Sequence, residues 1–162
     1  KPQAFCIERA KQAGIPQFIF SAKDYRDKAD YESAILEALK QHGVEFIVLA
    51  GYMRLIGTTL LRSFEGRIVN IHPSLLPAFP GKDAIGQALS SGVKVSGVTI
   101  HYVDEGMDTG PIIAQKAIEI SNEETFDTLQ TKIHGIEHEL YPAVLQNLLM
   151  QGDYHDKKTS TN

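Results

Sequence analysis

Apolar segments of two kinds alternate along this chain, and that alternation constrains its fold more than any other feature. Residues 44–50 (VEFIVLA) are nearly all apolar, and residues 67–71 (RIVNI) are a second short run rich in β-branched apolar residues; both are typical of buried strands. Over residues 31–41, by contrast, apolar side chains recur at helical spacing. Strands that alternate with helices in this way predict an α/β domain with a largely parallel sheet.

The same patterns predict the remaining elements. We expect helices over residues 4–13, 31–41, 60–64, 84–89 and 125–150. We expect strands over residues 15–20, 44–50, 67–71, 95–103 and 112–120, of which the last two form an antiparallel pair. Pro142 should kink the last helix, and residues 153–162 should form a disordered polar tail.

Composition argues against several classes of function. The formal net charge of −4 disfavours nucleic-acid binding, which usually requires a basic face. The single cysteine, Cys6, cannot form an internal disulfide, and the sequence has no Cys/His spacing typical of a zinc site. No apolar run approaches the roughly 18 residues of a membrane span. We therefore expect a cytoplasmic protein without a metal, and composition does not decide whether it is a monomer or a homodimer.

Two polar residues stand at the end of a predicted strand where α/β sheets bind their ligands. Asn70 lies within residues 67–71 and His72 follows two positions later, so both side chains point the same way. An amide is a neutral donor, and an imidazole can donate or accept a proton. This pair suits acyl transfer, in which an oxyanion must be stabilised and a proton must be moved.

Three acidic residues in one later turn are candidates for a carboxylate beside this pair. They are Asp104, Glu105 and Asp108, and the turn also contains Gly106 and Gly110, which let it fold tightly against a ligand. Residue spacing does not choose among the three acids. Taken singly, a histidine after a strand or an aspartate in such a turn is more often structural than catalytic.

Longer segments carry a specific resemblance. Residues 70–81 (NIHPSLLPAFPG) and 101–111 (HYVDEGMDTGP) resemble the two signature segments of the folate-dependent formyltransferases. Residues 50–57 (AGYMRLIG) resemble the folate-binding stretch of that family, and the similarity covers almost the whole chain. The resemblance implies a Rossmann-like, mostly parallel sheet flanked by helices, with an antiparallel strand pair and a long helix towards the C-terminus.

The resemblance also implies a reaction, in which the formyl group of 10-formyltetrahydrofolate passes to the amine of glycinamide ribonucleotide in de novo purine (IMP) biosynthesis. It implies that His72 is the general acid, that Asn70 hydrogen-bonds the formyl oxygen, and that Asp108 assists proton transfer. Pro73 and Glu137 are expected at the ribonucleotide. The residues expected at the folate are Lys28, Met53, Arg54, Leu55, Ile56, Asn70, Val103, Asp104 and Asp108.

Two further points follow from the family pattern. His101 and His138 also match it, and we interpret both as structural residues. The family begins with a strand, a Gly/Ser/Asn-rich loop and a helix whose N-terminus binds the substrate phosphate. This sequence starts roughly thirty positions into that pattern. We therefore expect a formyltransferase domain over residues 1–152 that lacks this segment.

Three alternatives to this transferase stay open at this point. A hydrolase of the same family would use the same three residues, but it usually carries another residue in place of Pro73 and an extra regulatory domain. A transferase acting on methionyl-tRNA would need a C-terminal RNA-binding domain. A folate-binding fragment without catalysis would bind folate analogues near residues 53–56 and show no turnover.

Overall fold

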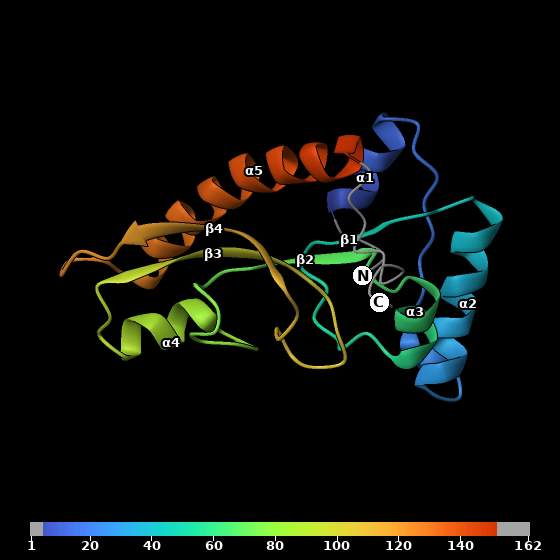
Figure 1. Ribbon diagram of the computed structural model, residues 1–162, viewed down its shortest axis with the longest axis horizontal. Helices are drawn as coiled ribbons and strands as arrows, with labels where there is room; N and C mark the ends of the chain where they lie inside the picture. The colour runs from blue at the N-terminus through green and yellow to red at the C-terminus, as the bar shows by residue number, and fades with distance from the viewer. Residues whose placement is uncertain (1–4, 152–162) are drawn as a thin grey trace, which may run out of the picture. The chain divides into compact units, whose positions relative to one another are not determined.

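The computed structural model describes residues 5–151, which divide into two compact units (Figure 1). The first unit comprises residues 5–44 and 57–63, and the second comprises residues 45–56 and 64–151. In chain order the elements are α1 (Phe5–Gln12), η1 (Ala22–Asp24), α2 (Lys28–Gln41), β1 (Ile47–Leu49), α3 (Thr58–Ser63), β2 (Ile68–His72), α4 (Ala84–Ser90), β3 (Val95–Tyr102), β4 (Ile112–Glu119) and α5 (Phe126–Gln151).

The first unit is helical and contains a buried carboxylate. Asp27 caps α2, because its side chain accepts a hydrogen bond from the backbone N–H of Asp30 at 2.9 Å. Glu32 of α2 is only 1% exposed, and its Oε1 accepts a hydrogen bond from the backbone N–H of Gly57 at 2.6 Å. A Cβ added at Gly57 would lie 2.5 Å from Oε2 of Glu32. The start of α3 is therefore held by a negative charge that only glycine lets approach so closely.

The second unit contains a four-stranded sheet in the order β1-β2-β3-β4. β1 and β2 are parallel, with Leu49 opposite Asn70. β2 and β3 are antiparallel, with Asn70 opposite His101, and β3 and β4 are also antiparallel. The α/β class, the antiparallel final strand pair and the long C-terminal helix are confirmed. Among the described strands only the β1–β2 pairing is parallel, so the sheet is mixed. The sequence did not predict the antiparallel β2–β3 pairing, because an apolar run carries no information on strand direction.

The predicted elements match the observed ones to within three residues at either end, except for the strand expected over residues 15–20. That segment is not a strand, and the prediction was wrong. Phe18 is about half exposed and packs edge-on against His42, with ring centroids 4.7 Å apart. A strand requires a hydrogen-bonded neighbour, and none of the four described strands pairs with this segment. α5 continues through Pro142, and the predicted tail at residues 153–162 lies outside the described residues.

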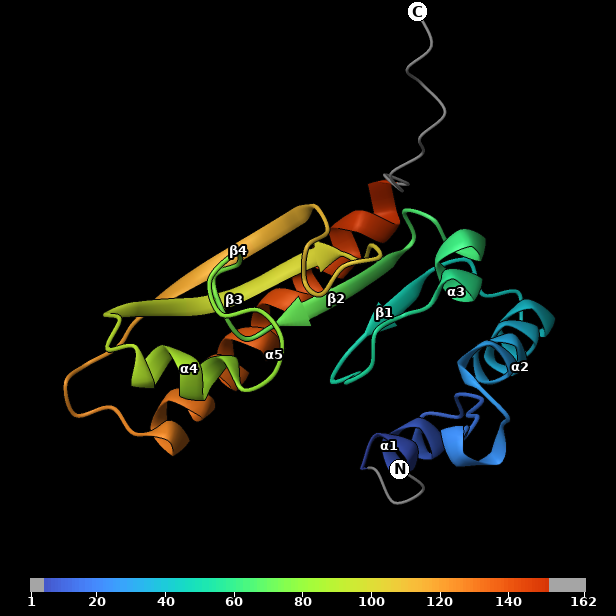
Figure 2. The same ribbon diagram turned by 90° about the horizontal axis from the view of Figure 1, so that it is seen from below.

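The core of the second unit lies between the sheet and the helices α4 and α5, and α5 runs along one face of the sheet (Figures 1 and 2). Its fully buried residues include Val98 of β3 and Leu129 and Ile133 of α5. Complete burial of each such side chain contributes about 1.5–3 kcal/mol to stability. This packing fixes α5 against the sheet and so positions one wall of the site described below.

A tyrosine of α5 ties two strands together at the end where the site lies. The hydroxyl of Tyr141 donates to the carbonyl of Leu49 at 2.8 Å and lies 3.3 Å from the carbonyl oxygen of Val69. Burial raises the pKa of Tyr141, so the hydroxyl remains a donor. The last residue of β1 and the second residue of β2 are thereby held together, next to residues that line the cavity described below.

Candidate active site

A cavity of about 650 Å³ lies in the second unit, and β2 delivers two of the predicted catalytic residues to it. Asn70 and His72 are the third and fifth residues of β2, so strand alternation places them on the same side. Both line the cavity, although His72 is only 5% exposed. The side chains predicted from their two-residue spacing are therefore brought together as expected.

The loop after β2 determines which nitrogen of His72 donates a hydrogen bond to the backbone. Nε2 lies 2.8 Å from the carbonyl oxygen of Phe79. Because a carbonyl only accepts, Nε2 carries a proton whether the ring is neutral or charged. Nδ1 is then the ring nitrogen left for a second partner. Phe79 has a φ of 54°, which is uncommon for a bulky residue, so the loop holds its carbonyl towards the histidine in a strained conformation.

Ser74 braces this loop from within, and Thr99 and Gln115 tie it to the sheet. Ser74 Oγ donates to the carbonyl of Ala78 at 2.5 Å, and Thr99 Oγ1 donates to the carbonyl of Ser74 at 2.7 Å. Thr99 Oγ1 in turn accepts from the backbone N–H of Leu76 at 3.0 Å. Gln115 Nε2 donates to the carbonyl of Leu76 at 3.0 Å and to Thr99 Oγ1 at 2.9 Å. Sequence reasoning missed Thr99 and Gln115, since only the β3–β4 register places them opposite each other.

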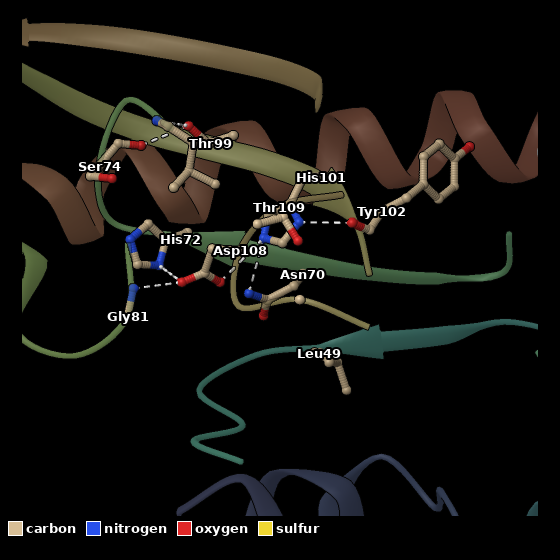
Figure 3. A network of polar contacts seen from close by, with 12 residues as sticks. Leu49, Asn70, His72, Ser74, Gly81, Thr99, His101, Tyr102, Asp108 and Thr109 are labelled. Carbon is tan, nitrogen blue, oxygen red and sulfur yellow. Dashed lines mark hydrogen bonds and ion pairs between the residues drawn. The ribbon is translucent and has the colours of Figure 1, made fainter. Parts of the chain in front are cut away.

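Asp108 is the acid that meets this histidine (Figure 3). Its Oδ2 lies 3.4 Å from Nδ1 of His72 and accepts a hydrogen bond from the backbone N–H of Gly81 at 2.8 Å. Its Oδ1 lies 3.6 Å from Nε2 of His101. One carboxylate therefore faces two imidazoles with its two oxygens. Residue spacing had left three acids open, and the fold selects the one that the family resemblance indicated.

Asp104 has a different task in the same turn. Its Oδ1 accepts hydrogen bonds from the backbone N–H of Gly106 at 3.0 Å and from Oγ1 of Thr109 at 2.6 Å. These bonds shape the turn that carries Asp108, whose φ of 56° lies in the left-handed region. Asp104 lines the cavity, whereas Glu105 does not.

Most of the other predicted site residues also line this cavity. Met53 is 72% exposed and Leu55 47% exposed, so much of the apolar lining still faces water. Lys28 belongs to the first unit, where its Nζ lies 3.8 Å from Oε1 of Glu32, and its role stays a prediction. The predicted residues that line the cavity besides those of the catalytic group are Met53, Arg54, Leu55, Ile56, Pro73, Val103, Asp104 and Glu137.

The α5 wall contributes a carboxylate and two imidazoles. Gln130, His134 and His138 follow one another at intervals of one helical turn, and together with Glu137 they line the cavity. Burial raises the pKa of Glu137, and the neighbouring His134, His138 and His72 partly oppose that shift. Sequence reasoning found Glu137 but missed His134 and Gln130. The available signal was that Gln130, His134 and His138 recur every four residues on a predicted helix, which places them on one face.

Taken together, the cavity offers an amide donor, an imidazole, and a carboxylate 3.4 Å from the Nδ1 of that imidazole. These groups can stabilise an oxyanion and move a proton. Within residues 5–151, no group of three or more His, Cys, Asp or Glu side chains is placed to hold one metal ion. None of the helices in this range is long and apolar enough to cross a membrane.

Comparisons with known proteins identify the family. Residues 1–145 match the family model described as formyl transferase. The chain is 62% identical over 149 residues to the phosphoribosylglycinamide formyltransferase of Bacillus subtilis (strain 168), covering 92% of this chain and 76% of that protein. It is 44% identical over 149 residues to the trifunctional purine biosynthetic protein adenosine-3 of Drosophila melanogaster, covering 92% of this chain and 11% of that protein.

Solved structures agree with this assignment. The crystal structure of phosphoribosylglycinamide formyltransferase from Bacillus halodurans matches with a TM-score of 0.91 at 58% identity, covering 94% of this chain and 79% of that one. Glycinamide ribonucleotide transformylase 1 from Geobacillus kaustophilus matches with a TM-score of 0.89 at 61% identity, covering 92% of this chain and 79% of that one. With the family model spanning most of its length, the chain belongs to the formyl transferase family.

Proposed function

We propose that this chain transfers the formyl group of 10-formyltetrahydrofolate to the amine of glycinamide ribonucleotide, as a step of purine biosynthesis in the cytoplasm. The observation that carries the proposal is the meeting of Asn70, His72 and Asp108 in one cavity, with 3.4 Å between Nδ1 of His72 and Oδ2 of Asp108. Identity of 62% to a phosphoribosylglycinamide formyltransferase supports this choice of substrates.

In this mechanism the amine attacks the formyl carbon directly, and no covalent enzyme intermediate forms. Attack creates a C–N bond and an oxyanion, to which the amide of Asn70 donates a hydrogen bond. Collapse of the intermediate breaks the bond between the formyl carbon and the folate nitrogen. The amine must lose a proton and the folate nitrogen must gain one, so the step needs a proton acceptor and a proton donor.

His72 and Asp108 are suited to these proton transfers. Nε2 of His72 is occupied by the Phe79 carbonyl, so a proton can leave or arrive only at Nδ1, which faces Oδ2 of Asp108. His72 acts as the general acid through Nδ1. Asp108 receives the proton of the attacking amine and stabilises the charged ring. Burial of the ring excludes bulk water from this exchange.

The folate occupies the side of the cavity formed by the segment after β1. Met53, Leu55 and Ile56 supply apolar surface for the pterin ring, while backbone groups of this segment read its polar edge. Val103 and Asp104 close the opposite side.

The ribonucleotide occupies the side formed by α5 and the start of the loop after β2. Glu137 accepts hydrogen bonds from the ribose hydroxyls, and Pro73 lies against the same substrate. A carboxylate kept half-buried without a lysine or arginine partner in the described residues destabilises the free protein. Such a group is retained most readily where a ligand supplies the missing donors.

The test measures loss of the formyl group from 10-formyltetrahydrofolate with and without glycinamide ribonucleotide, alongside formation of the formylated ribonucleotide. We expect loss of the formyl group only when the amine substrate is present, with one product formed per formyl group lost. Formyl release that proceeds equally without the amine would replace the transferase with a hydrolase. Binding of a folate analogue without turnover under either condition would favour a non-catalytic folate-binding protein.

A further inference from the structure

His101 lies between two of the three proposed catalytic groups and has no part in the mechanism described above. It stands directly opposite Asn70 in the β2–β3 ladder and is only 2% exposed. Its Nε2 lies 3.4 Å from Nδ2 of Asn70 and 3.6 Å from Oδ1 of Asp108 (Figure 3). A single nitrogen therefore contacts both the amide that is to bind the oxyanion and the carboxylate that is to accept a proton.

The other nitrogen of His101 shows where its proton lies. Nδ1 is 2.8 Å from the carbonyl oxygen of Tyr102, which can only accept, so Nδ1 carries a hydrogen. A neutral His101 then has a lone pair on Nε2, whereas a charged His101 has an N–H there. His72 has the opposite arrangement, because its Nε2 is the nitrogen that donates to a carbonyl. The two histidines that face Asp108 are thus fixed in opposite tautomers.

The lone pair of a neutral His101 decides how the Asn70 amide is oriented. The amide can turn by half a rotation and exchange the positions of its oxygen and its NH₂ group with almost no change in shape. A lone pair on Nε2 accepts from the NH₂ group and repels the oxygen, so only one orientation is stable. Without this contact the amide would present its oxygen to the oxyanion in part of the population, which would weaken the stabilisation.

The same charge state also leaves Asp108 to a single partner. A charged His101 would direct its Nε2–H towards Oδ1 of Asp108 and towards the NH₂ group of Asn70, which is itself a donor. The carboxylate would then be shared between two cations, and the amide would be driven to turn. A neutral His101 avoids both effects and leaves the Asp108 charge for His72.

We propose that His101 is a positioning residue that, as a neutral imidazole protonated on Nδ1, locks the Asn70 amide with its NH₂ group towards Nε2. This inference deepens the proposed function and rests on it for its catalytic consequence. The arrangement of protons can nevertheless be measured without turnover. The two tests below therefore separate a failure of this inference from a failure of the proposed function.

The first test records long-range ¹H–¹⁵N spectra of the whole chain labelled at its histidine ring nitrogens, at the pH of the activity assay. Protonated and bare ring nitrogens have well-separated shifts, and loss of one set of signals in His101→Gln assigns the residue. We expect Nδ1 of His101 to be protonated and Nε2 to be bare, with the reverse for neutral His72. A proton on Nε2 of His101 would overturn the inference, whether or not the protein transfers formyl groups.

The second test compares His101→Gln, whose Oε1 can still accept from the Asn70 amide, with His101→Leu, which fills similar space without an acceptor. We expect kcat to fall about 10- to 100-fold in His101→Leu, with changes of less than about threefold in KM for either substrate, and to recover most of this loss in His101→Gln. His42→Leu is the matched control, because His42 is exposed in the first unit and should leave kcat unchanged.

Two results of this comparison would overturn the inference. One is an equal loss of kcat in His101→Gln and His101→Leu after correction for the fraction folded, which would mark His101 as a structural residue only. The other is a loss carried by KM while kcat stays normal. If the unaltered chain transfers no formyl group at all, the proposed function fails, and the spectra alone decide whether His101 holds the amide.

Discussion

The segments that follow β1 and β2 begin at the same end of the sheet, because the two strands are parallel. They differ in how much of each segment the rest of the protein buries and hydrogen-bonds. In residues 73–81, Ser74 and Leu76 are buried, and their backbone groups are bonded by Thr99 and Gln115 of the neighbouring strands. In residues 50–56, the apolar side chains of Met53 and Leu55 are 72% and 47% exposed.

This difference separates two physical tasks. The groups that react must be held in position before the substrate arrives, since reorganisation during the reaction would raise the barrier. Apolar side chains contribute most to the free energy of binding if they stay exposed until the ligand covers them, at about 25 cal/mol per Å² of apolar surface buried. We therefore interpret residues 73–81 as a preorganised segment and residues 50–56 as a segment that a bound ligand completes, which in our proposal is the folate.

The largest effect should come from the preorganised side, in His72→Ala. Because this removes the only ring that can exchange a proton with Asp108 through Nδ1, we expect kcat for formyl transfer to fall at least about 100-fold. The Kd of a folate analogue, measured by calorimetry, should stay within a few-fold. The free energy of unfolding should fall by about 1 kcal/mol, because the Phe79 carbonyl loses its hydrogen-bond donor. Near-normal turnover in the folded variant would remove His72 from the mechanism.

A second substitution tests whether residues 73–81 are held by the sheet. Thr99→Val keeps the shape of the side chain but deprives the buried backbone of Ser74 and Leu76 of a partner, so the free energy of unfolding should fall by about 2 kcal/mol. Urea denaturation measures it. Thr131→Val is the matched control, because Thr131 is exposed on α5 and should change stability by less than about 0.5 kcal/mol. Equal losses of stability in Thr99→Val and Thr131→Val would show that the sheet does not hold residues 73–81 in place.

The open side should respond in the opposite way. Met53→Ala should change the free energy of unfolding by less than about 0.5 kcal/mol, because the side chain is largely in water. It should raise KM for the folate about three- to tenfold, because the ligand then covers less apolar surface. Met150→Ala, at another exposed methionine outside the cavity lining, should change neither quantity. A stability loss as large as that of Thr99→Val would show that residues 50–56 are also preorganised.

A small gain in stability is expected on the α5 wall, in Glu137→Gln. Burial raises the pKa of Glu137, so the folded protein binds that proton more tightly than the unfolded chain does. The wild type is therefore favoured at low pH and loses stability as the pH rises from the ordinary carboxyl value of 4.5 through the raised one. The variant should gain up to about 0.5 kcal/mol at neutral pH, because solvent screens this half-buried group.

Unfolding curves at pH 4 and pH 7 measure this difference between Glu137→Gln and the wild type. We expect the two proteins to converge at the lower pH and the variant to be the more stable at the higher pH. The KM for the ribonucleotide should rise several-fold, since a neutral amide binds ribose hydroxyls more weakly than a carboxylate. A variant less stable than the wild type at pH 7 would show that the carboxylate is structural.

Local patterns predicted nearly all the elements, and the exception is instructive. The helices and the strands that begin near residues 44, 67, 95 and 112 were found because their periodicity is a property of consecutive residues. Residues 15–20 are as apolar as the observed strands, but an apolar run becomes a strand only when a neighbour satisfies its backbone. That condition is set elsewhere in the chain, so composition cannot reveal it.

The amino-acid sequence alone determined the alternating α/β order, the common direction of Asn70 and His72, and, through the segments at residues 70–81 and 101–111, the family. Each of these is written in neighbouring residues or in a contiguous motif. The tertiary structure alone decided that β2 and β3 are antiparallel, and hence that His101 stands opposite Asn70.

The tertiary structure also decided the proton positions of the two histidines, through the carbonyls of Phe79 and Tyr102. The carbonyls of Tyr102 and Phe79 lie one and seven residues along the chain from their histidines, so they depend on local folding of the strand end and the loop. The contact of His101 with Asn70 joins residues 31 positions apart and depends on strand register. Hydrogen-bond partners of this kind exist only once the sheet has formed, because a strand shifted by one residue would turn every one of these side chains to the other face.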